Sequence, residues 1–149
     1  MKQSVILLVE DNADTRAALD LLLRDATFRV EMAGNGAQAL HLYRARRAED
    51  APYDLLVLDA ALPDFSGFAV AEEIRADGDQ QTPIIFCTAY DEPIAHARAH
   101  LVQAHDVWFK PDAMTDFKEL LTNALTHLAP ASNVAVPKMP HPVHEKRCP

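Results

Sequence analysis

Short apolar runs alternate with helix-like stretches along most of this chain. The runs predict β-strands at residues 4–9, 28–33, 54–59, 83–88 and 106–110. The first, third and fourth runs are apolar almost throughout, as expected of strands covered on both faces of a sheet, whereas the second alternates, which suits an edge strand. Strands and helices that alternate at this spacing predict right-handed parallel βαβ units, and therefore an α/β fold.

The stretches between the runs carry apolar residues at helical spacing. The faces expected to be buried comprise Ala18, Leu19, Leu22 and Leu23, then Ala39, Leu40 and Tyr43, and then Ala69, Val70 and Ile74 with Glu73 as a polar intruder. A final helix is predicted over residues 112–128, with an apolar stripe that starts at Phe117 and ends at Leu128.

The composition of the chain changes after residue 128. Half of the ten prolines fall between Pro130 and Pro149, among residues that could build little core. We therefore expect residues 1–128 to form one domain and residues 129–149 to form a Pro-rich, flexible tail. The apolar fraction of 49% is ordinary for a globular domain of this size.

Charge and cysteine content narrow the class of function. The net charge of −8 argues against nucleic-acid binding, which needs clustered Lys and Arg, and the basic residues from Arg44 to Arg47 read as a solvated helix face. Cys87 lies in an apolar run and Cys148 in the tail, so we expect no disulfide framework and a cytoplasmic location. The apolar run before Glu10 is too short for a signal peptide or a membrane span.

Polar residues stand at the end of four of the five runs. Glu10 and Asp11 follow the first run, Asp59 closes the third, Thr88 closes the fourth and Lys110 ends the fifth. The carboxyl ends of parallel strands line one edge of a sheet, where open α/β folds bind their ligands, so these side chains should converge. Capping of the helix that starts near residue 13 would explain one acid after the first run, but not three at one edge.

Three carboxylates at one edge repel each other unless a cation neutralises them or one stays protonated. An acidic, all-oxygen site suits Mg²⁺. An aspartate that faces a metal can act as a nucleophile and form an aspartyl phosphate, while an amine and a hydroxyl can bind phosphoryl oxygens. Taken singly, Thr88 could be an ordinary strand residue, Lys110 a surface charge, and Pro63 and Gly67 turn residues before a helix that starts at Ser66.

The ordered set of residues resembles the receiver domain of two-component response regulators, over residues 4 to about 128. Its features are two acids after the first strand, Asp after the third, Thr-Ala after the fourth and Lys-Pro after the fifth. The resemblance implies a doubly wound (βα)₅ fold of flavodoxin-like topology, with five parallel strands in the order 2-1-3-4-5. It also implies that Asp59 accepts a phosphoryl group.

The resemblance further implies a role for each polar residue of the set. Asp11 and Asp59 would bind Mg²⁺ directly, together with the backbone carbonyl of Ala61, and Glu10 would act mainly through metal-bound water. Thr88 would move toward the phosphoryl group, which Lys110 would hold. The chain would not otherwise be an enzyme, apart from Mg²⁺-dependent autophosphorylation and autodephosphorylation.

The implied partner is a sensor histidine kinase or a histidine phosphotransfer protein, and the implied output is protein–protein contact. The stretch after Leu128 is too short for an effector domain, so we expect a stand-alone receiver, or a receiver segment of a larger regulator or hybrid kinase. Three alternatives come from other classes. The first is an aspartyl-phosphate phosphohydrolase of the haloacid dehalogenase type, which would need Asp where Ala61 stands. The second is a flavin or nucleotide carrier, which would need a Gly-rich loop after the first strand. The third is a DNA-binding regulator.

One position departs from the family pattern. Val107 stands three residues before Lys110, where the family usually carries a Tyr or Phe switch residue. Alternation along the strand places Trp108 on the opposite face from Val107, where we expect it to be largely buried. A valine has no ring to swing inward, so the usual coupling of Thr88 to an aromatic side chain is in doubt.

Overall fold

The computed structural model describes residues 3–24, 27–89, 92–110 and 116–128. The expected tail over residues 129–149 lies outside these ranges, and so do Tyr90 and Pro111. Five parallel strands form one sheet in the order β2-β1-β3-β4-β5, which confirms the expected topology. The strands are β1 (Val5–Val9), β2 (Arg29–Ala33), β3 (Leu55–Asp59), β4 (Ile84–Thr88) and β5 (Asp106–Phe109).

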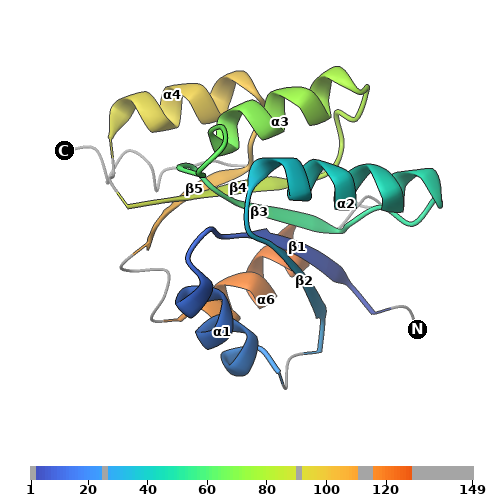
Figure 1. Cartoon of the computed structure of the whole chain (residues 1–149), viewed down its shortest axis with the longest axis vertical. Coiled ribbons are helices and arrows are strands. Elements are labelled where there is room, and N and C mark those ends of the chain that lie inside the picture. Colours follow the sequence, from blue (N-terminus) through green and yellow to red (C-terminus); the bar gives the residue numbers. More distant parts are fainter. Residues whose placement is uncertain (1–2, 25–26, 90–91, 111–115, 129–149) are drawn as a thin grey trace.

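Helices cover both faces of the sheet, as the doubly wound fold requires. The helices are α1 (Ala13–Leu22), α2 (Gly36–Ala48), α3 (Gly67–Ala76), α4 (Pro93–Leu101) and α6 (Phe117–His127). α1 and α6 lie on one face, while α2, α3 and α4 cover the other (Figure 1). None of the described helices is long and apolar enough to cross a membrane.

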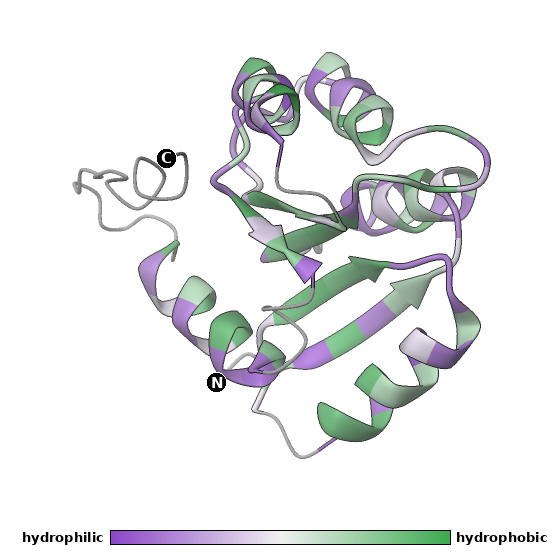
Figure 2. Cartoon of the chain, turned by 90° about the vertical axis from the view of Figure 1, so that its left-hand side faces the viewer, coloured by the Kyte–Doolittle hydropathy of each residue, from purple (hydrophilic) through white to green (hydrophobic). Residues whose placement is uncertain are grey.

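The core is divided in two by the sheet. β1, β3 and β4 are buried along their whole length. Alternate residues of a strand enter opposite clusters: Leu7 and Leu56 pack toward α2, α3 and α4, whereas Ile6 and Leu55 pack toward α1 and α6. Figure 2 shows this as largely apolar strands between helices that carry both apolar and polar residues. β2 is paired on one edge only, and it is the strand that was expected at the edge.

Three of the helices that follow a strand begin at a side-chain cap. The side-chain oxygens of Asn12, Asn35 and Ser66 accept hydrogen bonds from backbone N–H groups in the first turns of α1, α2 and α3. Each cap satisfies one of the N–H groups that a helix leaves without a partner at its start. The caps stand at the carboxyl edge of the sheet, so they also fix the loops there.

Two helix predictions need correction. The final helix was expected over residues 112–128, but Asp116 has non-helical backbone angles and α6 covers Phe117–His127; residues 112–115 lie outside the described ranges. In α1, Leu19 is buried, as is Leu23 directly after the helix, but Ala18 is exposed and Leu22 is 47% exposed. The buried stripe of α1 is narrow because residues four apart share a face, whereas their immediate neighbours point about 100° away.

Candidate phosphorylation and metal site

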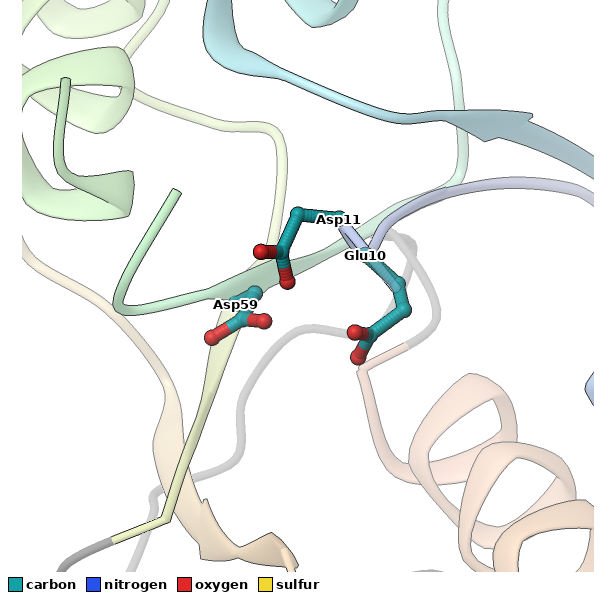
Figure 3. Close-up of side chains that lie close together, drawn as sticks. All are labelled: Glu10, Asp11 and Asp59. Carbon is teal, nitrogen blue, oxygen red and sulfur yellow. The ribbon is translucent and has the colours of Figure 1, made fainter. Parts of the chain in front are cut away.

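Three carboxylates meet at the carboxyl edge of the sheet, as the sequence predicts. One oxygen from each of Glu10, Asp11 and Asp59 lies within 4.8 Å of the others. Figure 3 shows the carboxylate of Asp11 directed toward Asp59, with that of Glu10 to one side. Glu10 and Asp59 are buried, at 3% and 4% exposure, whereas Asp11 is exposed.

The capping explanation for these acids does not apply. Asn12 is the residue that caps α1, because its Oδ1 accepts a hydrogen bond of 2.9 Å from the backbone N–H of Thr15. Glu10 accepts a hydrogen bond of 3.0 Å from the N–H of Asn12 instead. Capping of α1 therefore does not account for the three acids at the sheet edge.

Lys110 joins two of the acids. Its ammonium lies 3.0 Å from Oε1 of Glu10 and 3.0 Å from Oδ2 of Asp59. Burial alone would lower the pKa of Lys110, but hydrogen bonds to Glu10 and Asp59 more than offset this and raise it. The amine therefore stays charged at neutral pH, as the binding of a phosphoryl oxygen requires.

The surroundings of Asp59 act on the pKa of its carboxyl group in opposite directions. Burial raises the pKa of Asp59, while the backbone N–H of Ala61, 3.0 Å from Oδ1, and the ammonium of Lys110 oppose the rise. The neighbouring charge of Glu10 raises the pKa further.

Thr88 and Lys110 reach the same edge of the sheet from the ends of β4 and β5. Asp59 of β3 is in register with Cys87 of β4, and Thr88, the last residue of β4, is in register with Phe109. Thr88 is buried, at 8% exposure, and Lys110 follows β5 directly. The residues expected at the site thus converge, with Ala61 in the exposed loop after β3.

Val107 and Trp108 lie on opposite faces of β5, as expected. Val107 packs in the cluster beneath α4, and Trp108 packs in the cluster with α6. Trp108 packs against this cluster and is partly rather than fully buried. β5 is an edge strand, and only the ring of Phe117, edge-on with centroids 5.8 Å apart, covers Trp108 among the aromatic contacts of the described residues.

The donor set fits a hard divalent cation. All three side chains offer carboxylate oxygens, and the exposure of Asp11 and Ala61 leaves space for water on the metal. Mg²⁺ prefers this combination of few carboxylates and several waters. One contact at the site was not evident from the sequence: Nη1 of Arg16 donates a hydrogen bond of 2.8 Å to the backbone carbonyl of Glu10. No motif singles out this arginine.

Comparison with known proteins also identifies a receiver domain. A family model for the response regulator receiver domain matches residues 6–122. SilR of Salmonella typhimurium, described as a probable transcriptional regulatory protein, is 35% identical over 123 residues, which are 83% of this chain and 50% of that protein. The chain spans about half or less of the length of the curated relatives that it matches most clearly.

Solved structures of receiver proteins also superpose on this fold. The non-phosphorylated HemR receiver domain of Leptospira biflexa has a TM-score of 0.71 and 30% identity, over 89% of this chain and all of that chain. TrrA of Thermotoga maritima, solved in complex with Mg²⁺ and BeF, has a TM-score of 0.64 and 28% identity, over 81% of this chain and 98% of its own. The chain therefore belongs to the response regulator receiver domain family, the phosphorylation-controlled switches of two-component signalling.

Proposed function

We propose that Asp59 accepts a phosphoryl group from a phosphohistidine on a sensor histidine kinase or a histidine phosphotransfer protein. The observation that carries this proposal is the placement of Asp59, buried beside the ammonium of Lys110 and within a cluster of three carboxylates. A carboxylate oxygen of Asp59 attacks phosphorus in line with the leaving imidazole. The phosphorus–nitrogen bond breaks, a phosphorus–oxygen bond forms, and the imidazole nitrogen keeps the electron pair.

Asp11, Asp59 and the carbonyl of Ala61 would hold Mg²⁺, with Glu10 acting through metal-bound water. The metal ion supplies positive charge that offsets the carboxylates and the transferred phosphoryl oxygens. Lys110 binds one phosphoryl oxygen and the hydroxyl of Thr88 another, in a site where charge-assisted hydrogen bonds are strong. Water later hydrolyses the acyl phosphate, and the small side chain of Ala61 leaves that approach open.

The phosphoryl group signals by biasing the surface formed by α4, β5 and α6. Two large apolar side chains of α4, Ile94 at 64% and Leu101 at 81% exposure, support a protein contact on this surface. We place the switch in the cytoplasm, where the buried thiol of Cys87 stays reduced. The domain can be a protein by itself or a segment of a larger regulator or hybrid kinase. A phosphohydrolase is not favoured, because Ala61 stands where that class needs a second aspartate.

Acetyl phosphate and Mg²⁺, followed by intact mass measurement, test the proposal. The unsubstituted protein should gain one phosphoryl group that is labile to hydroxylamine, and Asp59→Asn should gain none. Asp20→Asn, which removes an exposed carboxylate from α1, is the matched control and should be labelled normally. Undiminished labelling of Asp59→Asn would exclude Asp59 as the acceptor.

A further inference from the structure

We propose that Arg16 is a positioning residue for the metal site. It holds the peptide that joins Glu10 to Asp11, and so sets the direction of the Asp11 carboxylate toward a bound divalent cation. This inference rests on the proposed Mg²⁺ site and adds a residue that governs it without touching the metal.

Arg16 reaches back from α1 to the end of β1. Its Nη1 donates a hydrogen bond of 2.8 Å to the backbone carbonyl of Glu10. The backbone N–H of Glu10 donates to the carbonyl of Ala33, 3.0 Å away in β2. Both polar backbone groups of Glu10 are therefore held, one by the neighbouring strand and the other by the guanidinium.

Asp11 depends on this restraint more than the other two acids do. The carboxylates of Glu10 and Asp59 are each bonded to Lys110 and to a backbone N–H group. Asp11 is exposed, and its carboxylate forms no ion pair or hydrogen bond with any other described residue. Its direction is set by its backbone, and the carbonyl that Arg16 holds belongs to the peptide unit directly before it.

Gly34 makes room for the guanidinium. A Cβ atom at this position would lie 2.9 Å from Nη1 of Arg16 and 3.3 Å from its Cζ. The backbone of Gly34 is not in the left-handed region, so an alanine is compatible with its conformation. The obstructing atoms are the end of a flexible side chain, so Gly34→Ala should displace the guanidinium while it leaves the fold and the charge of Arg16 intact.

Removal of Arg16 should change Mg²⁺ affinity in one direction if Arg16 acts through its charge, and in the opposite direction if it acts by positioning Asp11. Loss of a positive charge that contacts the backbone of Glu10, beside the acidic cluster, strengthens the attraction of a cation and should tighten Mg²⁺ binding. Loss of a contact that orients a ligand should weaken it, by about tenfold on the scale of other groups that support metal ligands from behind. The sign of the change therefore separates the two roles.

The experiment is a calorimetric titration with Mg²⁺ alone, without phosphodonor. We expect Arg16→Met and Gly34→Ala each to weaken Mg²⁺ binding by about tenfold, and the double variant to bind no more weakly than Arg16→Met. Arg24→Met is the matched control, because Arg24 is exposed and pairs only with Asp20 among the described ion pairs, at the far end of α1. It should bind as the unsubstituted protein does.

Two results would overturn the inference. One is Mg²⁺ binding by Arg16→Met as tight as, or tighter than, that of the unsubstituted protein, and the other is full additivity in the double variant. Melting curves in EDTA show whether each variant is folded, and Gly34→Ala retains the test if Arg16→Met is not. An unsubstituted protein that binds no Mg²⁺ would instead remove the proposed metal site itself.

Discussion

Gly67, the first residue of α3, lies close to the backbone at the end of β3. A Cβ atom there would lie 2.2 Å from the carbonyl oxygen of Asp59 and 3.3 Å from Cα of Ala60. Both are backbone atoms, which cannot move aside by rotating a side chain. The absence of a side chain at this position therefore helps to set where β3 ends and where the Asp59 carboxylate stands.

Gly67→Ala should consequently lower both stability and reactivity. Forcing the contact apart should cost about 1–3 kcal/mol of unfolding free energy, as other overpacked sites do. Phosphorylation by acetyl phosphate should slow, because a small displacement of a nucleophile is costly. Gly78→Ala is the control: its φ of 101° strains an alanine, but its nearest neighbour atom is 4.0 Å away in Arg47, remote from the site. Equal phosphorylation rates for the two variants would contradict this account.

Val107 and Thr88 differ in what they can transmit from the site. Val107 is 5% exposed and packs against small residues of α4, so its side chain can move only a small apolar group. We expect Thr88→Ala to reduce the phosphorylation-dependent change in amide exchange of α4 more than Val107→Ala does. Val107→Ala should mainly cost stability, about 1–3 kcal/mol. If Val107→Ala abolishes the change and Thr88→Ala preserves it, β5 carries the switch despite lacking an aromatic ring.

At the scale of elements, Asp79 ties α2 to the loop between α3 and β4. Its carboxylate accepts hydrogen bonds from the hydroxyl of Tyr43 at 2.7 Å and from the hydroxyl and N–H of Thr82 at 2.5 and 2.9 Å. Burial alone would raise the pKa of Asp79, but the bonds from Thr82 and Tyr43 lower it to about 2. The ionised carboxylate is thus stabilised in the fold.

The lowered pKa gives Asp79 a defined pH dependence. Its contribution is present above the unfolded pKa, near 4, and is lost as pH falls from there through about 2. Asp79→Asn should cost about 2 kcal/mol of unfolding free energy at neutral pH and flatten the loss of stability between pH 4 and 2. Denaturant unfolding across this range measures both. An unchanged slope in Asp79→Asn would show that other carboxylates account for the acid sensitivity.

Most strands and helices could be predicted, because burial of one or both faces determines where their apolar residues stand in the sequence. Each of the five strands starts and ends within one residue of the range expected from its apolar run. The start of α6 could not be predicted, because an apolar stripe shows which residues face the core but not where the backbone leaves the helix. The exposure of Leu22 was missed for a related reason: the pattern does not reveal how wide a face the sheet covers.

At the scale of the whole molecule, the site could be predicted because topology forms it. A parallel sheet brings the strand ends to one edge, so Glu10, Asp11 and Asp59 converge whatever the details of their loops. The sharing of Lys110 between two acids and the contact of Arg16 with Glu10 could not be predicted, because they depend on side-chain reach across elements. Those contacts decide how strongly the three carboxylates repel each other in the absence of metal.

That remaining repulsion should make Mg²⁺ a stabiliser of the whole domain. Lys110 neutralises part of the charge of Glu10 and Asp59, but Asp11 adds a third carboxylate without an ion pair among the described residues. A ligand that binds only the folded state adds RT ln(1 + [L]/Kd) to stability, about 2.7 kcal/mol at a hundredfold excess over Kd. Melting in EDTA and in Mg²⁺ should therefore differ clearly for the unsubstituted protein.

Asp11→Asn should raise the melting temperature in EDTA, because it removes one repelling charge, and should blunt the rise caused by Mg²⁺, because it removes a ligand. Asp50→Asn is the matched control. Asp50 is exposed after the end of α2, away from the site, and its φ of 59° is one that asparagine tolerates. It should leave the response to Mg²⁺ unchanged. If Mg²⁺ does not change the melting temperature of the unsubstituted protein, the result would count against the metal site. If Mg²⁺ raises the melting temperature of Asp50→Asn as little as it raises that of Asp11→Asn, the effect would come from overall charge.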